Sequence, residues 1–176
     1  MIRIGAKIAT LAITGFLATA CTVQPLYAPS GPASAVQNAA LASIYVKPAD
    51  DRVGQQVRNA LIFLLNGGSG QPANPAYELD LKVSRSNRGT LVIQTPNDGE
   101  PTASTVTVTT NYTLTDTVDE TKISARRASA SASYDVSGQE FANARAERDA
   151  ENRAARDVAE RIRALLAADL ARAGRQ

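Results

Sequence analysis

The chain has 176 residues, a formal net charge of +2, a single cysteine, and neither histidine nor tryptophan. Without histidine it lacks the usual general base at neutral pH, so Ser-His-Asp, Cys-His and zinc sites are excluded. One cysteine excludes an internal disulfide, and the weak net charge gives no indication of nucleic-acid binding.

The chain begins with the pattern of a secretory signal peptide. Arg3 and Lys7 form a short positive region, and the apolar run 8–17 follows it. That run has the length of a signal sequence and is shorter than the roughly 20 apolar residues that span a bilayer. Small residues then lead to a cleavage site, so residues 1–20 are predicted to be a signal peptide that is removed on export.

A cysteine stands directly after the predicted cleavage site. The residues before it resemble a bacterial lipobox and are Leu17, Ala18, Thr19 and Ala20, with Ala18 where leucine is usual. In such a motif the cysteine receives diacylglycerol and, after cleavage, an N-acyl chain, which together anchor a protein stably. We therefore expect covalent S-diacylglycerol and N-acyl lipid on Cys21, and no other cofactor. By resemblance to known lipoproteins, Thr22 in place of aspartate favours the outer membrane, facing the periplasm.

One folded domain is predicted after the lipidated cysteine. Residues 21–41 are rich in proline, alanine and serine, which predicts a flexible tether. The domain, 42–176, opens with a short strand over 44–46 that ends before a proline. A helix follows over 52–65, with Asp50-Asp51 to cap its start and Gly67-Gly68 to stop it.

Alternating polar and apolar residues predict the strands of a sheet. The cleanest alternation covers 105–114, and a similar one covers 77–83. A further extended stretch, 90–95, is expected after a turn at 86–89. The last strand ends near Tyr134, with a bulge near Arg126-Arg127 to restore its register.

A long helix is predicted from about residue 138 to 173, because this stretch has no proline and no interior glycine. The residues expected on its apolar face are Phe141, Ala144, Ala155, Val158, Ile162, Leu165 and Leu166. The predicted fold class is α+β. It is a two-layer sandwich, with a mixed or antiparallel sheet of four to five strands covered on one face by two helices, the C-terminal one long.

The mature chain resembles the lipopolysaccharide-assembly lipoprotein family, LptE, especially its shorter alphaproteobacterial forms. The resemblance rests on the order of several segments, which are Cys21 with residues 23–27, then 44–46, 54–61, 77–79, 132–135 and 141–146. It implies a non-enzymatic outer-membrane lipoprotein that sits inside the LptD β-barrel. There it assists the transport of lipopolysaccharide and its insertion into the outer leaflet.

Basic side chains are the candidates for contact with the phosphates of lipopolysaccharide. One group of candidates is Lys82, Arg85 and Arg88; the other is Lys122, Arg126 and Arg127. Ordinary surface charge is the alternative reading of both groups.

Two other functions remain open at this level. An accessory lipoprotein of an envelope lipid ABC transporter would also have a lipobox and a small α+β domain. A carboxylate-based periplasmic hydrolase would need two facing acids, for which Glu78 and Asp80 are the only candidates outside turns and the last helix.

Overall fold

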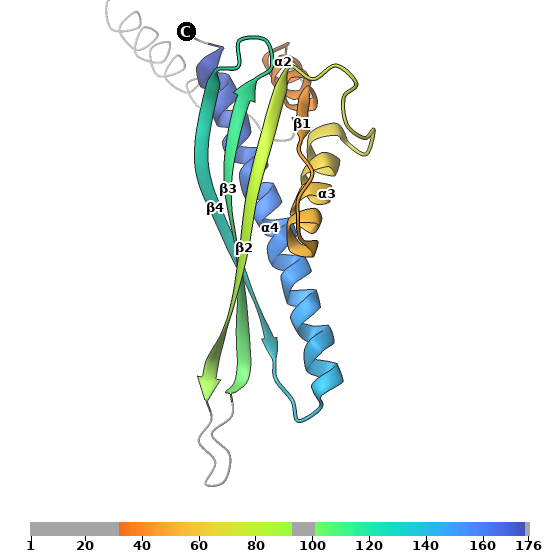
Figure 1. Ribbon diagram of the computed structural model, residues 1–176, viewed down its shortest axis with the longest axis vertical. Coiled ribbons are helices and arrows are strands. Elements are labelled where there is room, and N and C mark those ends of the chain that lie inside the picture. Colours follow the sequence, from red (N-terminus) through yellow and green to blue (C-terminus); the bar gives the residue numbers. More distant parts are fainter. Residues whose placement is uncertain (1–31, 93–100, 175–176) are drawn as a thin grey trace, which may run out of the picture. The chain divides into compact units, whose positions relative to one another are not determined.

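The computed structural model describes residues 32–92 and 101–174. The predicted signal peptide, its lipobox and Cys21 lie outside these residues. The described elements, in chain order, are α2 (Pro32–Ala42), β1 (Ile44–Val46), α3 (Arg52–Asn66), β2 (Tyr77–Val92), β3 (Pro101–Asp116), β4 (Lys122–Asp135) and α4 (Glu140–Ala173) (Figure 1).

The four strands form one mixed sheet in the order β1-β2-β3-β4. β1 is parallel to β2, and the other neighbouring pairs are antiparallel. Helices α3 and α4 pack against each other and against the sheet (Figure 1). The predicted α+β fold, with two helices on one face and a long C-terminal helix, is therefore confirmed.

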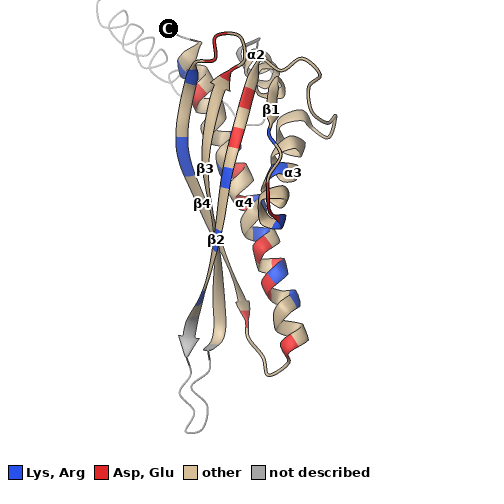
Figure 2. Ribbon diagram, viewed as in Figure 1, with Lys and Arg blue, Asp and Glu red and all other residues tan. Residues whose placement is uncertain are grey.

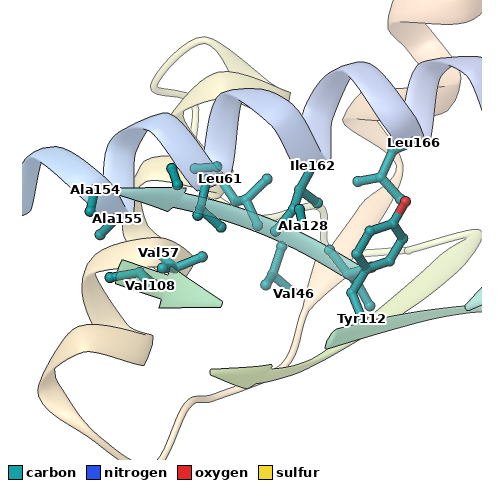
Figure 3. Close-up of a cluster of buried hydrophobic side chains, with 14 of the residues drawn as sticks. Val46, Val57, Leu61, Val108, Tyr112, Ala128, Ala154, Ala155, Ile162 and Leu166 are labelled. Carbon is teal, nitrogen blue, oxygen red and sulfur yellow. The ribbon is translucent and has the colours of Figure 1, made fainter. Parts of the chain in front are cut away.

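The core lies between the sheet and the two helices. Strand β3 alternates as predicted, so that Val106, Val108 and Leu114 are fully buried. The buried side chains of β4 are alanines, and those of α4 include several more; Figure 3 shows Ala128 of β4 beside Ile162 of α4. Larger buried residues complete the core: Val57 and Leu61 come from α3 and Ile162 from α4, and Leu166 of α4 lies against Tyr112 (Figure 3).

Helix α3 begins and ends as the sequence predicts. The Asp51 carboxylate accepts a hydrogen bond of 2.7 Å from the Gly54 amide, which satisfies one of the free amides of the first turn. A side chain at Gly54 would place its Cβ 2.6 Å from the Asp51 carboxylate, so glycine is what allows this cap to close. Gly67 ends the helix with a φ of 58°, a backbone conformation that favours glycine.

Helix α2 corrects the prediction at the end of the tether. Residues 32–41, expected to be flexible, are helical, and Leu41 is buried in the core. The amide of Gln37 donates a hydrogen bond of 3.0 Å to the backbone carbonyl of Ala167 on α4. Alanines favour a helix as well as a linker, and these tertiary contacts decide between the two.

The sheet corrects two further predictions. Residues 86–89, expected as a turn, continue β2 without interruption, because pairing with β3 overrides the local turn preference. The separate stretch 90–95 is therefore the end of β2 as far as Val92, and its remainder lies outside the described residues. The bulge expected near Arg126-Arg127 lies instead at Ile123, between the pairs Leu114–Ser124 and Thr115–Lys122.

The buried face of α4 begins later than predicted. Phe141 is 90% exposed and Ala144 is exposed, whereas burial starts at Ala150. The first residue of α3, Arg52, hydrogen-bonds to Asn152. The start of α3 is thus level with the second third of α4, so the first turns of α4 lack α3 as a packing partner.

None of the described helices has the length and apolar character needed to cross a bilayer.

Candidate functional site

Hydroxyl side chains cover the face of the sheet that points away from α3 and α4, which we call the open face. Alternation along β3 and β4 puts these residues on one side. They are Thr105, Thr107, Thr109, Thr113, Thr115, Ser129, Ser131 and Ser133. Hydrogen bonds of 2.8 Å join Thr105 to Ser133 and Thr107 to Ser131 across the two strands. The result is a polar surface that has no large apolar side chain on these two strands.

Basic residues lie at one end of the open face. Lys82, Asn111 and Arg127 are direct neighbours across β2, β3 and β4. Beside them is a shallow hollow of about 380 Å³, whose lining includes Lys82, Lys122 and Lys47. Figure 2 shows acidic and basic residues following one another along the first half of β2.

The sheet divides each predicted basic group between its two faces. Lys82, Arg88, Lys122 and Arg127 lie on the open face, but Arg85 and Arg126 point toward the helices. The groups are therefore not brought together as predicted. The period of two could have shown this, because Arg85 is in phase with the apolar Val83 and Arg126 with Ala128.

Arg85 belongs to an ion-pair network that joins three elements. The Glu151 side chain on α4, only 7% exposed, pairs with Arg85 of β2 at 2.8 Å and with Arg52 of α3. Arg85 also lies 3.1 Å from Glu147. Burying a carboxylate is costly unless opposite charges surround it, so Glu151 fixes how α4 sits against β2 and α3. Helical spacing already puts Glu151 on the predicted apolar face, four residues before Ala155 and seven before Val158, but its partners could not be predicted from the sequence.

Arg126 belongs to a second network, near the C-terminal end of α4. The buried Asp169 pairs with Arg126 at 2.8 Å and with Arg172 at 3.1 Å. The Tyr112 hydroxyl donates a hydrogen bond of 3.5 Å to the same carboxylate. Burial raises the pKa of Tyr112 to about 12, and the negative charge of Asp169 adds to this effect. Arg126 therefore neutralises a buried carboxylate of α4 and does not lie on the open face.

The two acids proposed for a hydrolase share one strand and one face. Lys47 lies 2.5 Å from Glu78 and 4.0 Å from Asp80. The hydrogen bond with Glu78 raises the pKa of Lys47. Two carboxylates side by side on one strand do not face each other across a cleft, so the arrangement gives a glycosidase-type mechanism no support. Nor does the described part of the chain hold a cluster of three or more acidic or other metal-binding side chains.

The comparison with protein families decides the identity. The family described as lipopolysaccharide-assembly, LptE, matches residues 41–166. The chain belongs to the LptE family. The match runs from the end of α2 into the last third of α4, so it includes the whole sheet, α3 and most of α4. The resemblance recognised in the sequence is confirmed.

Solved structures agree with membership of LptE. A candidate lipoprotein from Caulobacter crescentus CB15 is 26% identical, with a TM-score of 0.64, and the match covers 78% of this chain and 97% of that one. The rare lipoprotein B from Shewanella oneidensis is 13% identical, with a TM-score of 0.54 and coverages of 74% and 96%. A minor lipoprotein from Acinetobacter baumannii is 16% identical, with a TM-score of 0.51 and coverages of 72% and 89%. The last two share the fold. A search of curated protein sequences found no match.

The raised pKa of Tyr112 predicts how the stability of this LptE-family chain depends on pH. Between pH about 10 and 12 the folded chain keeps the phenol proton that the unfolded chain loses. The stabilisation is therefore complete below pH about 10 and is lost as the pH rises to about 12. Tyr112→Phe should remove this loss, which is on the order of 1–3 kcal/mol. Urea unfolding of both proteins at about pH 8 and about pH 11 measures it. Equal losses in the two proteins would contradict the assignment.

Proposed function

We propose that this protein is an outer-membrane lipoprotein that assembles with a large β-barrel of the LptD type. In that complex it plugs the barrel and assists the transport of lipopolysaccharide and its insertion into the outer leaflet. Membership of the lipopolysaccharide-assembly family over residues 41–166 is the observation that carries this proposal. The role is structural rather than enzymatic, as expected for a chain without histidine.

The anchor is proposed to be the lipid on Cys21. The lipobox and the preceding apolar run support it, and the single cysteine has no partner for a disulfide. With two or more acyl chains the attachment is stable, and residues before α2 connect it to the folded domain. Thr22 supports delivery to the outer membrane, with the domain on the periplasmic side.

The open face supports a barrel as the partner. The inner wall of a wide outer-membrane barrel is polar, and so is a surface of threonine and serine hydroxyls. Such a surface exchanges hydrogen bonds with another polar wall without burying unpaired charge. The opposite face of the sheet is already occupied by α3 and α4.

Contact with lipopolysaccharide is proposed for the basic residues that remain on the open face. Lys82, Lys122 and Arg127 lie at one end of it, and Arg88 lies further along β2. In the described part of the chain, none of the four forms an ion pair with an acidic side chain. They can therefore bind phosphate oxygens without first breaking an internal contact.

The partner is tested by affinity purification of the tagged, lipidated protein from detergent-solubilised outer membranes, followed by mass spectrometry. We expect one large barrel protein in equal amount. Recovery of an inner-membrane permease with its substrate-binding subunits would instead support the transporter-accessory function. Recovery of no partner would leave the assembly role without a barrel and contradict the proposal.

The anchor is tested by Cys21→Ala. Because the acylated atom is removed while the folded domain is untouched, the variant should move from the detergent phase to the aqueous phase on phase partition. Thr22→Ser, next to the acylation site, is the matched control and should remain in the detergent phase. If Cys21→Ala also remains there, the cysteine is not the anchor.

Phosphate contact is tested by reversing charge on the open face. Lys82→Glu with Arg127→Glu should weaken binding of lipopolysaccharide by the purified domain about tenfold or more, since two charge-assisted contacts are lost. Arg145→Glu with Arg156→Glu makes the same change of net charge on the exposed side of α4. Equal binding by the wild type and the open-face variant, or an equal loss in the α4 control, would argue against a specific site.

A further inference from the structure

The two outer edges of the sheet differ in how far other parts of the chain occupy their backbone groups. On β4, arginines of α4 cover the edge. Arg153 donates a hydrogen bond of 2.9 Å to the backbone carbonyl of Ser133, and Arg161 donates one to the carbonyl of Ser129. The two arginines are eight residues apart on α4, and the two serines are four residues apart on β4. Both separations span about 12–13 Å, so the same contact is made twice along the edge. Side chains that occupy edge carbonyls prevent a further strand from pairing there.

The edge of β2 is paired with another strand only at its start, and Gly54 of α3 lies beside Val83 further along it. β1 pairs with Tyr77–Leu79, and the last contact is a hydrogen bond of 3.0 Å from the Lys47 amide to the Leu79 carbonyl. Odd-numbered residues of β2 therefore point their backbone groups outward on this side. The register with β3 is unbroken as far as Gly89, so the same holds for Val83, Arg85 and Asn87. No backbone group in the described ranges pairs with these three.

The open-face side chains in the middle of this edge are small. Ser84 and Ser86, which are small, lie between Lys82 and Arg88 on the open face. The two basic residues are six positions apart, which is about 20 Å along a strand. They lack acidic partners among the residues described, so the edge combines free backbone groups with unneutralised positive charge.

We propose that the edge of β2 from Val83 to Gly89 accepts an extended, acidic segment of the barrel partner as a fifth strand. This inference rests on the proposed function, since it assigns the segment to the barrel. Backbone hydrogen bonds to Val83, Arg85 and Asn87 supply the pairing. Acidic side chains on the open-face side of the segment meet Lys82 and Arg88. Strand addition is one-sided, because the arginines of α4 close the edge of β4.

A second copy of this chain is the less favourable occupant. An antiparallel pair of β2 strands related by a two-fold axis at Arg85, the middle of the segment 82–88, places Lys82 of each copy opposite Arg88 of the other. Like charges directly opposite on neighbouring strands are destabilising. The charges of this edge therefore suit an acidic segment and disfavour a copy of the chain itself.

Proline at an outward-pointing amide tests the pairing. Asn87→Pro removes one edge donor and leaves the ladder with β3 intact, because proline is tolerated where the amide faces solvent. Recovery of the barrel with the tagged, lipidated full chain should fall about tenfold. Asn87→Ala is the first control, since it loses the side-chain bonds to Tyr134 and Glu147 but keeps the amide. Ser131→Pro is the second, since it makes the same change at the closed edge of β4. Both controls should recover the barrel as the wild type does.

The outcomes separate this inference from the proposed function. If the wild type recovers a barrel and Asn87→Pro recovers as much, strand addition is wrong and the assembly role stands. If Ser131→Pro loses the barrel equally, the effect is not specific to β2 and the inference fails. If the wild type recovers no barrel, both fail.

Amide hydrogen exchange covers the case in which Asn87→Pro does not fold. In the wild-type complex the amides of Val83, Arg85 and Asn87 should exchange at least about tenfold more slowly than in the free protein, because each becomes hydrogen-bonded. Unchanged exchange at these amides, or a dimer of this chain in place of the barrel complex, would overturn the inference.

Discussion

Alanine lies against alanine where α4 meets β4, and the arrangement of the other elements depends on this contact. Ala128, Ala130 and Ala132 of β4 are buried, as are Ala150, Ala154, Ala155 and Ala159 of α4. Side chains this small let the helix approach the strand closely. The same closeness brings Arg153 and Arg161 within reach of the β4 backbone and leaves a wider space on the other side, which α3 fills with Val57 and Leu61.

Contacts between alanines do not by themselves fix the rotation of a helix about its axis, because such small side chains do not interdigitate. Two buried carboxylates supply that definition. Glu151 pairs with arginines of α3 and β2, and Asp169 pairs with Arg126 of β4. A buried carboxylate that lost its partners would be strongly destabilising, so α4 is held in the one setting that keeps both paired. The ion pairs therefore set position more than they add stability.

The covered face and the open face are consequences of one alternation. Because β3 sends its apolar residues to the helices, its threonines necessarily form the opposite surface. Within the residues that the structure describes, the basic residues of the strands that point to this surface form no ion pair with α4. Arg85 and Arg126 point the other way and pair with buried carboxylates of α4. The proposed place inside a polar barrel would use both features, a rigid interior and a polar exterior.

The sequence by itself determined the local features of this protein. Asp51 defines the start of α3 by a hydrogen bond from the Gly54 amide, and Gly67 defines its end by a positive φ. The period of two in β3 defines which of its side chains are buried. The order of its segments was enough to recognise the LptE family over the chain that the family matches. These features depend on neighbours along the chain, which a sequence displays directly.

Only the tertiary structure decided the features that depend on distant partners. Residues 86–89 were predicted to form a turn but belong to β2, because each of them pairs with a residue of β3. Residues 32–41 were predicted to be a flexible tether but form a helix, because Leu41 is buried in the core and Gln37 hydrogen-bonds to α4. Glu151, Asp169, Arg85 and Arg126 look like surface charge in a sequence, and their inward roles follow from which element lies across from them. A charged residue's direction in a strand can be read from its phase, but its partner is known only when the elements are packed.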